Sequence, residues 1–184
     1  AGIIEAAVEL GSTPRHAANA VEAIMTSDTR PKQIAVQFKL DGKSVRIGGM
    51  CKGAGMIQPG MSATGARPAA TPLHATMLCF ITTDAAIDAR PLQAALQEAV
   101  ANSFNRITVD GDMSTNDTVL ALANGFAGNR LISSLDSPDG RRFQKALIFV
   151  CETLARKIVS DGEGVTRAVN VRVTGAMSHL DAAR

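Results

Sequence analysis

The stretch "IAVQFKLDGKSVRI", residues 34–47, carries the clearest structural signal in the chain. Apolar and polar residues alternate on both sides of the pair Asp41-Gly42. The alternating apolar residues are Ile34, Val36, Phe38, Leu40, Val45 and Ile47. Such alternation is typical of a strand with one buried face, and Asp-Gly is a preferred tight turn between antiparallel strands. The stretch therefore predicts a β-hairpin with one face toward a core.

Helical and strand patterns are interspersed around this hairpin. Capping and periodicity signals predict helices over 12–25, 90–104, 114–125 and 141–159. A continuous apolar run predicts a buried strand over 77–83, and shorter strands are predicted over 106–110 and 168–175. No linker or internal repeat divides the chain, so residues 1–184 are expected to form a single domain with a layered α+β fold.

The composition is that of a globular domain. The 184 residues are 46% hydrophobic and 20% charged, which allows one hydrophobic core. A net charge of +2, no Trp or Tyr and six Phe argue against a nucleic-acid-binding surface. The chain has no run of about 18 apolar residues and no basic signal-peptide start. The three cysteines Cys51, Cys79 and Cys151 are scattered, so we expect reduced thiols in a cytoplasmic protein. From the charge and hydropathy, we expect contacts with neither nucleic acid nor membranes.

Two segments look like known binding motifs but lack the residues that these motifs require. The Gly-rich segment 48–56 lacks the residue order of a phosphate-binding loop. The acidic segment that begins at Asp110 has Thr115 and Ala121 where a calcium loop requires Gly and Glu. The three histidines share no metal-ligand spacing with the cysteines, so no metal is expected.

Thr76 stands between a Pro-rich loop and the apolar run 77–83. A threonine hydroxyl becomes a usable nucleophile when the chain is cut before it, because the freed α-amine then serves as base. Its small neighbour Ala75 would leave the preceding carbonyl accessible. Ala-Thr pairs also end at Thr64 and Thr71, but only Thr76 leads directly into a predicted buried strand. From the residues alone, a nucleophile and an ordinary strand-initiating threonine both remain open.

Five segments together resemble the ornithine acetyltransferase (glutamate N-acetyltransferase) family of arginine biosynthesis. They are "AIMTSDTRPK", "GGMCKGAGMIQPGM", "ATMLCFITTDAAI", "SFNRITVDGDMSTNDTVLALANG" and "IVSDGEGVTRAVNVRVTGA", in this order. The resemblance implies part of a layered αββα sandwich of the DmpA/ornithine acetyltransferase type. It also implies self-cleavage into α and β chains that form a hetero-oligomer. The reaction implied is acetyl transfer from N²-acetyl-L-ornithine to L-glutamate.

The resemblance assigns roles to five residues. Thr76 matches the nucleophile, and the bond Ala75–Thr76 matches the cleavage site. Thr26, Lys52 and Glu163 match substrate-binding positions. A structural interpretation is also available for these three: a helix-capping threonine, a solvated lysine and a surface glutamate. No metal or organic cofactor is implied, and acetyl-CoA remains open as an alternative acetyl donor.

The chain departs from the family pattern in two ways. Gly60 stands where the family has Asn, and residues 62–74 look like an inserted loop before the cleavage site. The insertion makes Thr64 a competing nucleophile, because Thr64 lies closer to the family's usual distance from Lys52. Family members are much longer, and their oxyanion-hole Thr-Gly pair and C-terminal pocket region have no match here, so the chain resembles an internal fragment that could be inactive alone. A self-processing aminopeptidase of the same fold and a non-catalytic, unprocessed module are the alternatives.

Overall fold

The computed structural model describes residues 2–61, 77–178 and 181–182. Within them lie four α-helices, one short 3-10 helix and four strands. In chain order they are α1 (Gly2–Val8), α2 (Pro14–Ala23), β1 (Lys32–Leu40), β2 (Lys43–Lys52), β3 (Leu78–Thr83), α3 (Ala89–Ala101), η1 (Phe104–Arg106), β4 (Thr118–Ala123) and α4 (Pro138–Val159). The mixture confirms the predicted α+β class. No helix in the described part of the chain is long and apolar enough to cross a membrane.

The four strands form one sheet in the order β1-β2-β3-β4. β1 and β2 form the predicted hairpin, with Asp41 and Gly42 at positive φ values of 48° and 73° in its turn. β2 pairs with β3 in antiparallel orientation, and β3 pairs with β4 in parallel orientation. The buried strand predicted over 77–83 is therefore the inner strand β3.

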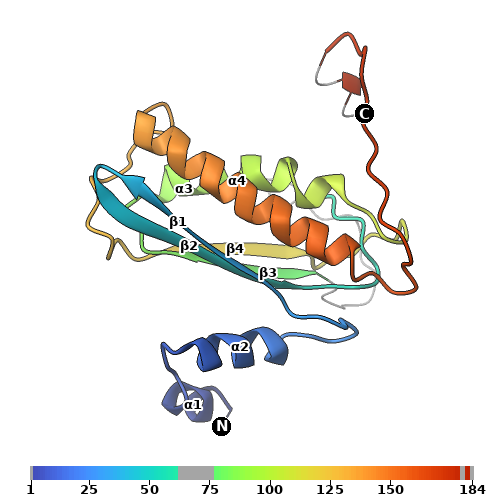
Figure 1. The fold of residues 1–184 in the computed structure, drawn as a ribbon, viewed down its shortest axis with the longest axis horizontal. Helices are drawn as coiled ribbons and strands as arrows, with labels where there is room; N and C mark the ends of the chain where they lie inside the picture. The colour runs from blue at the N-terminus through green and yellow to red at the C-terminus, as the bar shows by residue number, and fades with distance from the viewer. Residues whose placement is uncertain (1, 62–76, 179–180, 183–184) are drawn as a thin grey trace.

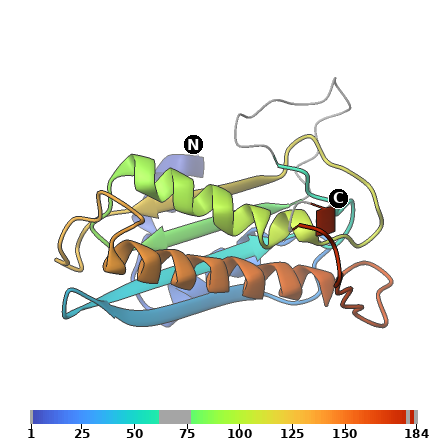
Figure 2. The ribbon, with the colours of Figure 1, turned by 90° about the horizontal axis from the view of Figure 1, so that it is seen from above.

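Helices α3 and α4 lie side by side across one face of this sheet (Figures 1 and 2). Alternate strand residues such as Val45, Ile47 and Ile81 are buried on that face, and the core is completed by Phe143 and Leu154 of α4. Gly49 permits the close approach of α4 to β2, because a Cβ added there would lie 2.9 Å from the Leu154 side chain and 3.1 Å from that of Val150. The two predicted helices 90–104 and 141–159 correspond to α3 and α4.

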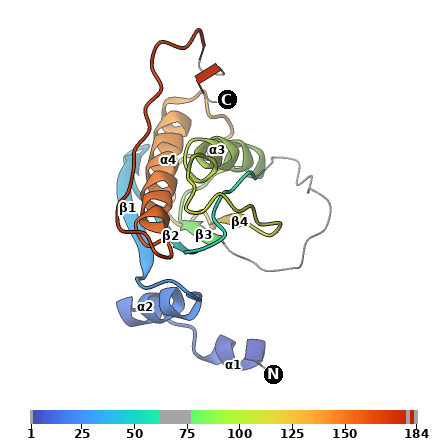
Figure 3. The ribbon, with the colours of Figure 1, turned by 90° about the vertical axis from the view of Figure 1, so that its right-hand side faces the viewer.

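The opposite face of the sheet is only partly covered. Helices α1 and α2 lie on that side, below the β1–β2 end of the sheet (Figure 3). Helix α2 confirms the helix predicted over 12–25, whereas α1 was not predicted. Leu120 and Leu122 of β4 point to this face and are 49% and 67% exposed. The described residues thus form one sheet with helices packed over a single face.

The helix predicted over 114–125 is wrong, because residues Thr118–Ala123 form strand β4. Leu and Ala favour helices, and Ser114 and Gly125 suited its two ends, but pairing with β3 overrides that local preference. As a strand, the segment directs Val119 and Ala121 toward the core. A run of six residues was too short for its period to separate helix from strand.

Two predicted strands are also wrong. Residues 106–110 instead end the 3-10 helix and enter a loop, in which the Val109 N–H donates to the Ile57 carbonyl at 2.8 Å. Residues 168–175 have the alternation of a strand but pair with no strand in the described part of the chain. Their side chains at Val169 and Val171 are 81% and 80% exposed. A strand requires a hydrogen-bonding neighbour, which the sequence pattern alone does not supply.

Candidate active site

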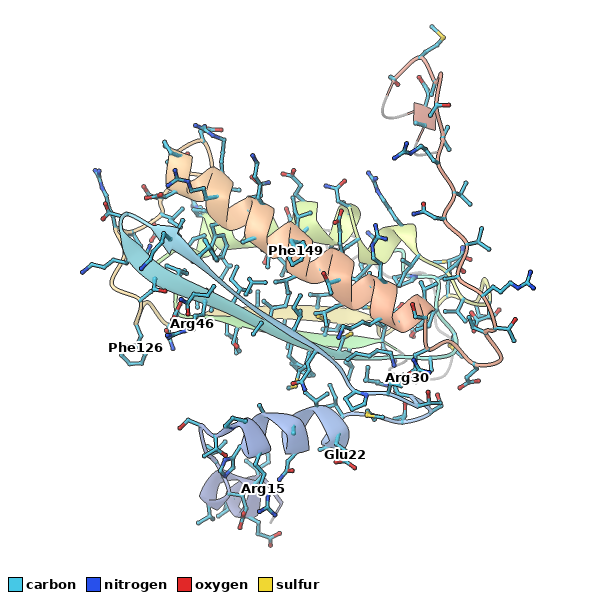
Figure 4. All side chains as sticks on the ribbon, viewed as in Figure 1. Arg15, Glu22, Arg30, Arg46, Phe126 and Phe149 are labelled. Atoms are coloured by element: carbon cyan, nitrogen blue, oxygen red, sulfur yellow. The ribbon has the colours of Figure 1, made fainter. Side chains whose placement is uncertain are left out.

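Four strand ends and one helix end meet at the same end of the molecule (Figure 1). β1 begins at Lys32, which pairs with Cys51, and β2 ends at Lys52, which pairs with Leu78 at the start of β3. Leu78 in turn pairs with Thr118 at the start of β4. Figure 4 shows Arg30 at this end, near the end of α4, and Arg46 at the other end of the sheet. The described candidate site residues, Thr26, Lys52 and Glu163, all lie at this end.

Lys52 is a buried lysine, only 5% exposed. Its Nζ donates to Thr26 Oγ1 at 3.5 Å, so two of the expected substrate-binding residues lie in direct contact. Thr26 follows the end of α2 and does not cap a following helix; its own N–H donates to Asp28 Oδ2 at 3.2 Å. The solvated-lysine and helix-capping interpretations of these two residues are therefore wrong.

Glu163 is exposed and lies over the loop that follows Lys52. Its N–H donates to the Ala54 carbonyl at 2.8 Å. A Cβ added at Gly55 would lie 2.9 Å from Glu163 Cδ, so a side chain at residue 55 would displace the carboxylate from this position. The structure thus brings the Asp-Gly-Glu-Gly turn against the Lys-Gly-Ala-Gly loop.

Ala75 and Thr76, the expected cleavage site, lie outside the described residues, as does the loop 62–74. Met77, the residue after Thr76, is fully buried. Its N–H donates to Asp117 Oδ1 at 3.1 Å, and its carbonyl accepts from the Thr118 N–H at 3.0 Å. The chain is thus fixed directly after the expected nucleophile, at the start of β3.

Asn105 fixes Met61 in a similar way. Its Oδ1 accepts from the Met61 N–H at 3.1 Å, and its Nδ2 donates to the Met61 carbonyl at 2.9 Å. Met61 and Met77 are the described residues on either side of 62–76. Both are therefore held by side chains from residues 105–117, a segment that begins in η1 and continues as one loop to the start of β4.

The same loop also holds the Gly-rich segment through Asp110. This carboxylate accepts from the N–H groups of Met56 at 2.6 Å and Ile57 at 3.0 Å. Burial raises the pKa of Asp110, but backbone donors, among them Asp112, Ile57 and Met56, lower it below the usual range. The charged carboxylate stabilises Met56 in a left-handed conformation with φ of 54°, which is rare for a non-glycine residue.

A buried ion triad lies directly beside Lys52. Lys32 is 1% exposed, and its Nζ lies 2.5 Å from both Asp28 Oδ1 and Asp161 Oδ2. Asp28 Oδ1 also accepts from the Gly53 N–H at 2.7 Å. Asp161 accepts from the Thr29 N–H at 3.0 Å, from the Thr29 hydroxyl, and from the Arg30 N–H at 3.3 Å.

Both carboxylates of the triad are ionised at neutral pH. Burial raises the pKa of Asp28, but hydrogen bonds from Lys32, Gly53 and Thr26 lower it below its ordinary value. For Asp161, burial is likewise outweighed, mainly by the bonds from Lys32 and Thr29, and its pKa falls to about 2. One lysine therefore faces two anions in a buried position.

The three cysteines are buried and form no disulfide. Burial raises the pKa of Cys51 and of Cys151 to about 12 and raises that of Cys79 well above its usual value. Since the thiolate is the reactive form, these residues are inert at neutral pH. Among the described residues, no group of three or more His, Cys, Asp or Glu side chains is placed to hold a metal ion.

Most of these contacts have no local signal in the sequence. Asp28 and Asp161 lie within segments singled out above, yet their joint partner Lys32 is 129 residues from Asp161. Asn105, Asp110 and Asp117 act on backbone groups that are 40 to 54 residues away. Only the spatial arrangement shows them to be parts of one site.

The sequence was compared with protein families and with known proteins. A family model described as the ArgJ family matches residues 1–184, the whole chain. The chain therefore belongs to the ArgJ family.

Two curated relatives illustrate the match. The chain is 51% identical over 166 residues to the glutamate N-acetyltransferase of Methanocaldococcus jannaschii, covering 90% of this chain and 37% of the relative. It is 47% identical over 180 residues to the arginine biosynthesis bifunctional protein ArgJ of Bacillus subtilis, covering 97% of this chain and 41% of the relative. The chain thus spans about two fifths of the length of these relatives.

A solved structure also matches part of the chain. It is the arginine biosynthesis bifunctional protein from Bacillus halodurans, 50% identical, with a TM-score of 0.44. The match covers 47% of this chain and 39% of that one.

Proposed function

We propose that this chain is the central part of a self-cleaving acetyltransferase of arginine biosynthesis, with Thr76 as its nucleophile. The complete enzyme would move an acetyl group from N²-acetyl-L-ornithine to L-glutamate. Membership of the ArgJ family and the names of its relatives support this assignment. The observation that carries it is the contact between buried Lys52 and Thr26, at the strand end where Lys52 pairs with Leu78, two residues after Thr76.

Self-cleavage is the proposed first step. The Thr76 hydroxyl attacks the Ala75 carbonyl carbon, the peptide C–N bond breaks, and the acyl group moves to the threonine oxygen. Water then hydrolyses this ester and leaves Ala75 with a carboxylate and Thr76 with a free α-amine. A free α-amine has a pKa of about 8, close to the working pH, and is therefore a suitable base for its own hydroxyl.

Acetyl transfer then follows in two half-reactions. The Thr76 oxygen attacks the acetyl carbonyl of N²-acetylornithine, the amide C–N bond breaks, and ornithine leaves with the proton held by the α-amine. The α-amine of glutamate next attacks the acetyl-threonine ester and the acyl C–O bond breaks. The proton lost by the glutamate amine passes through the Thr76 α-amine to the threonine oxygen as N-acetylglutamate forms. Hydroxyl and amine supply the nucleophile and the base, so the proposed reaction uses no metal or organic cofactor.

The remaining site residues would bind the parts of the substrate that do not react. Lys52 offers a cation for a substrate carboxylate. Glu163 offers an anion for the side-chain amine of ornithine, and Thr26 offers a hydroxyl beside Lys52. The inert thiols of Cys51 and Cys79 leave the nucleophile role to a hydroxyl, which also favours Thr76.

The partly exposed face of the sheet supports an αββα sandwich in the complete enzyme. A second sheet would pack against β4, where Leu120 and Leu122 are exposed, and its residues would come from the rest of the longer protein. The α and β chains made by cleavage would remain associated as a hetero-oligomer, and the enzyme would be cytoplasmic. An assay with acetyl-CoA and glutamate tests whether acetyl-CoA serves as a second acetyl donor.

Kinetics of the full-length enzyme test the proposal. A covalent acetyl-enzyme predicts parallel double-reciprocal plots with N-acetylornithine and glutamate as the varied substrates. Intersecting lines without an acetylated Thr76 peptide would contradict the mechanism. Assays with N-acetylornithine and with an aminoacyl nitroanilide separate the acetyltransferase from a self-processing aminopeptidase. A single uncut mass without either activity would favour a non-catalytic module.

A further inference from the structure

The buried triad of Lys32, Asp28 and Asp161 connects the three segments that carry the described site residues. These segments are the residues after α2, the loop after β2 and the turn after α4. They are distant in sequence and contribute Thr26, Lys52 and Glu163, respectively. Each segment is irregular, so its position depends on specific hydrogen bonds rather than on a helix or a sheet.

Asp28 joins the first two segments. One of its oxygens accepts from the Thr26 N–H at 3.2 Å, and the other accepts from the Gly53 N–H at 2.7 Å. Thr26 and Gly53 are thereby held on one carboxylate, and the Lys52 side chain meets the Thr26 hydroxyl beside them. Gly53 has a φ of 148°, a conformation that favours glycine and aims its N–H at the carboxylate.

Asp161 joins the third segment to the first. Its oxygens accept from Thr29 and Arg30, which follow Asp28 in the chain. Two residues further along, the Glu163 N–H donates to the Ala54 carbonyl, so the turn is also held against the loop after β2. A displacement of Asp161 would therefore move Glu163 relative to Lys52.

Lys32 is the common partner of both carboxylates. Its Nζ contacts Asp28 and Asp161 at 2.5 Å each, and its side chain is 1% exposed. It begins β1, so the lysine is anchored to the sheet as well as to the two loops. The three groups together carry one excess negative charge.

We propose that Lys32, Asp28 and Asp161 are positioning residues that set the distance between Thr26, Lys52 and Glu163 and thereby determine substrate affinity. The inference rests on the proposed function, because it takes these three residues to bind the amine and carboxylate of the substrate. Such groups do not change during acetyl transfer, so their contacts are equally strong in the ground state and the transition state. Loss of this uniform binding raises KM and leaves kcat nearly unchanged.

Asp161→Asn in the full-length enzyme is the decisive variant. It retains the side-chain size and leaves Lys32 and Asp28 as a balanced ion pair, so the fold is expected to persist. Lys32→Met would leave two facing carboxylates and is less informative because it can prevent folding. Asp161→Asn should raise KM for N-acetylornithine on the order of tenfold to a hundredfold, with kcat within about threefold.

A double-mutant cycle separates positioning from a general structural effect. If Asp161 acts through Glu163, adding Asp161→Asn to Glu163→Gln should cost far less than Asp161→Asn alone. Hydrogen exchange supplies a readout without catalysis: the Glu163 amide should exchange faster in Asp161→Asn, while amides of α3 stay protected. Asp139→Asn, at an ion pair 3.5 Å from Arg142 on α4, is the matched control and should change neither KM nor exchange.

The outcomes separate the two claims. An unchanged KM and unchanged Glu163 exchange in Asp161→Asn, in an enzyme whose wild type transfers acetyl groups, would overturn the positioning role alone. Fully additive losses in the cycle, or an equal rise of KM in Asp139→Asn, would also overturn it. A wild-type enzyme without any transfer would instead refute the proposed function and, with it, the substrate-positioning role.

Discussion

Lys32 and Asp161 are 129 residues apart in sequence, yet Lys32 Nζ lies 2.5 Å from Asp161 Oδ2. Both side chains are buried, at 1% and 4% exposure. This ion pair connects the start of β1 to the turn after α4. Asp161 also accepts from the Thr29 N–H, which is 132 residues away, and several expected outcomes depend on these long-range contacts.

Replacement of Lys32 should strongly lower the free energy of unfolding. Lys32→Met leaves Asp28 and Asp161 facing one another without a cation, and loss of one partner of a buried ion pair costs about 3–5 kcal/mol. Denaturant unfolding of the full-length protein measures the loss. Lys39→Met, at an exposed position of the same strand, is the control and should change the free energy of unfolding by less than about 0.5 kcal/mol. Equal, small effects at both positions would contradict the burial of the triad.

Acid should weaken the fold through Asp161. Its folded-state pKa is lowered from 3.8 to about 2, so its contribution is complete above about pH 4 and is lost as the pH falls toward about 2. Unfolding free energies measured across this window should decline less steeply in Asp161→Asn than in the wild type. An identical pH dependence of the two proteins would show that Asp161 is not held in its charged form.

Gly49 should tolerate no larger side chain. Its added Cβ would meet buried Leu154 and Val150, and overpacking of a core typically costs about 1–3 kcal/mol. Gly49→Val is expected to fall in or above this range by thermal or denaturant unfolding. Gly48→Val is the matched control, because Gly48 lies on the other face and its Cβ would meet only Thr82 Oγ1 at 3.6 Å. Larger destabilisation by the Gly48 variant would reverse the assignment of the two faces.

Asn105 should matter for self-cleavage. It holds Met61 through two hydrogen bonds, while Asp117 holds Met77, so the segment 105–117 fixes the chain on both sides of residues 62–76. Asn105→Ala should slow the appearance of two chains from the full-length precursor, followed by mass spectrometry over time. Asn124→Ala removes only a local bond to the Phe126 N–H and should process at the wild-type rate. Equal rates for both variants would exclude this role of Asn105.

The sequence identified elements whose local pattern and tertiary environment agree. The Asp41-Gly42 hairpin combines alternating apolar residues with a tight turn, the inner strand β3 is a continuous apolar run, and the long helix α4 has a clear helical period. The prediction for β4 was wrong because its Leu and Ala residues favour a helix, and only pairing with the neighbouring β3 makes it a strand. The strand predicted over 168–175 was wrong for the opposite reason: apolar and polar residues alternate there, but no neighbouring strand among the described residues pairs with them.

The candidate site was predictable only through motif resemblance. Thr26, Lys52 and Glu163 carry no distinctive spacing, and their proximity arises from hydrogen bonds made by Asp28 and Asp161. The burial of Lys52 at the end of a strand could not be inferred from a lysine that stands between Cys51 and Gly53 in a Gly-rich segment. Long-range polar contacts of this kind produce no periodic residue pattern, so they cannot be predicted from a single sequence.

The central claim is that Thr76 is freed by cleavage and carries the acetyl group. The most direct test is mass spectrometry and N-terminal sequencing of the full-length enzyme after brief exposure to N-acetylornithine without glutamate. We expect a β chain that begins Thr76-Met77-Leu78, with one acetyl group on the threonine oxygen. Thr76→Ala should give a single uncut, inactive chain. Thr64→Ala and Thr71→Ala should still be cut. A β chain that begins at Thr64, or an uncut enzyme that still transfers acetyl groups, would contradict the central claim.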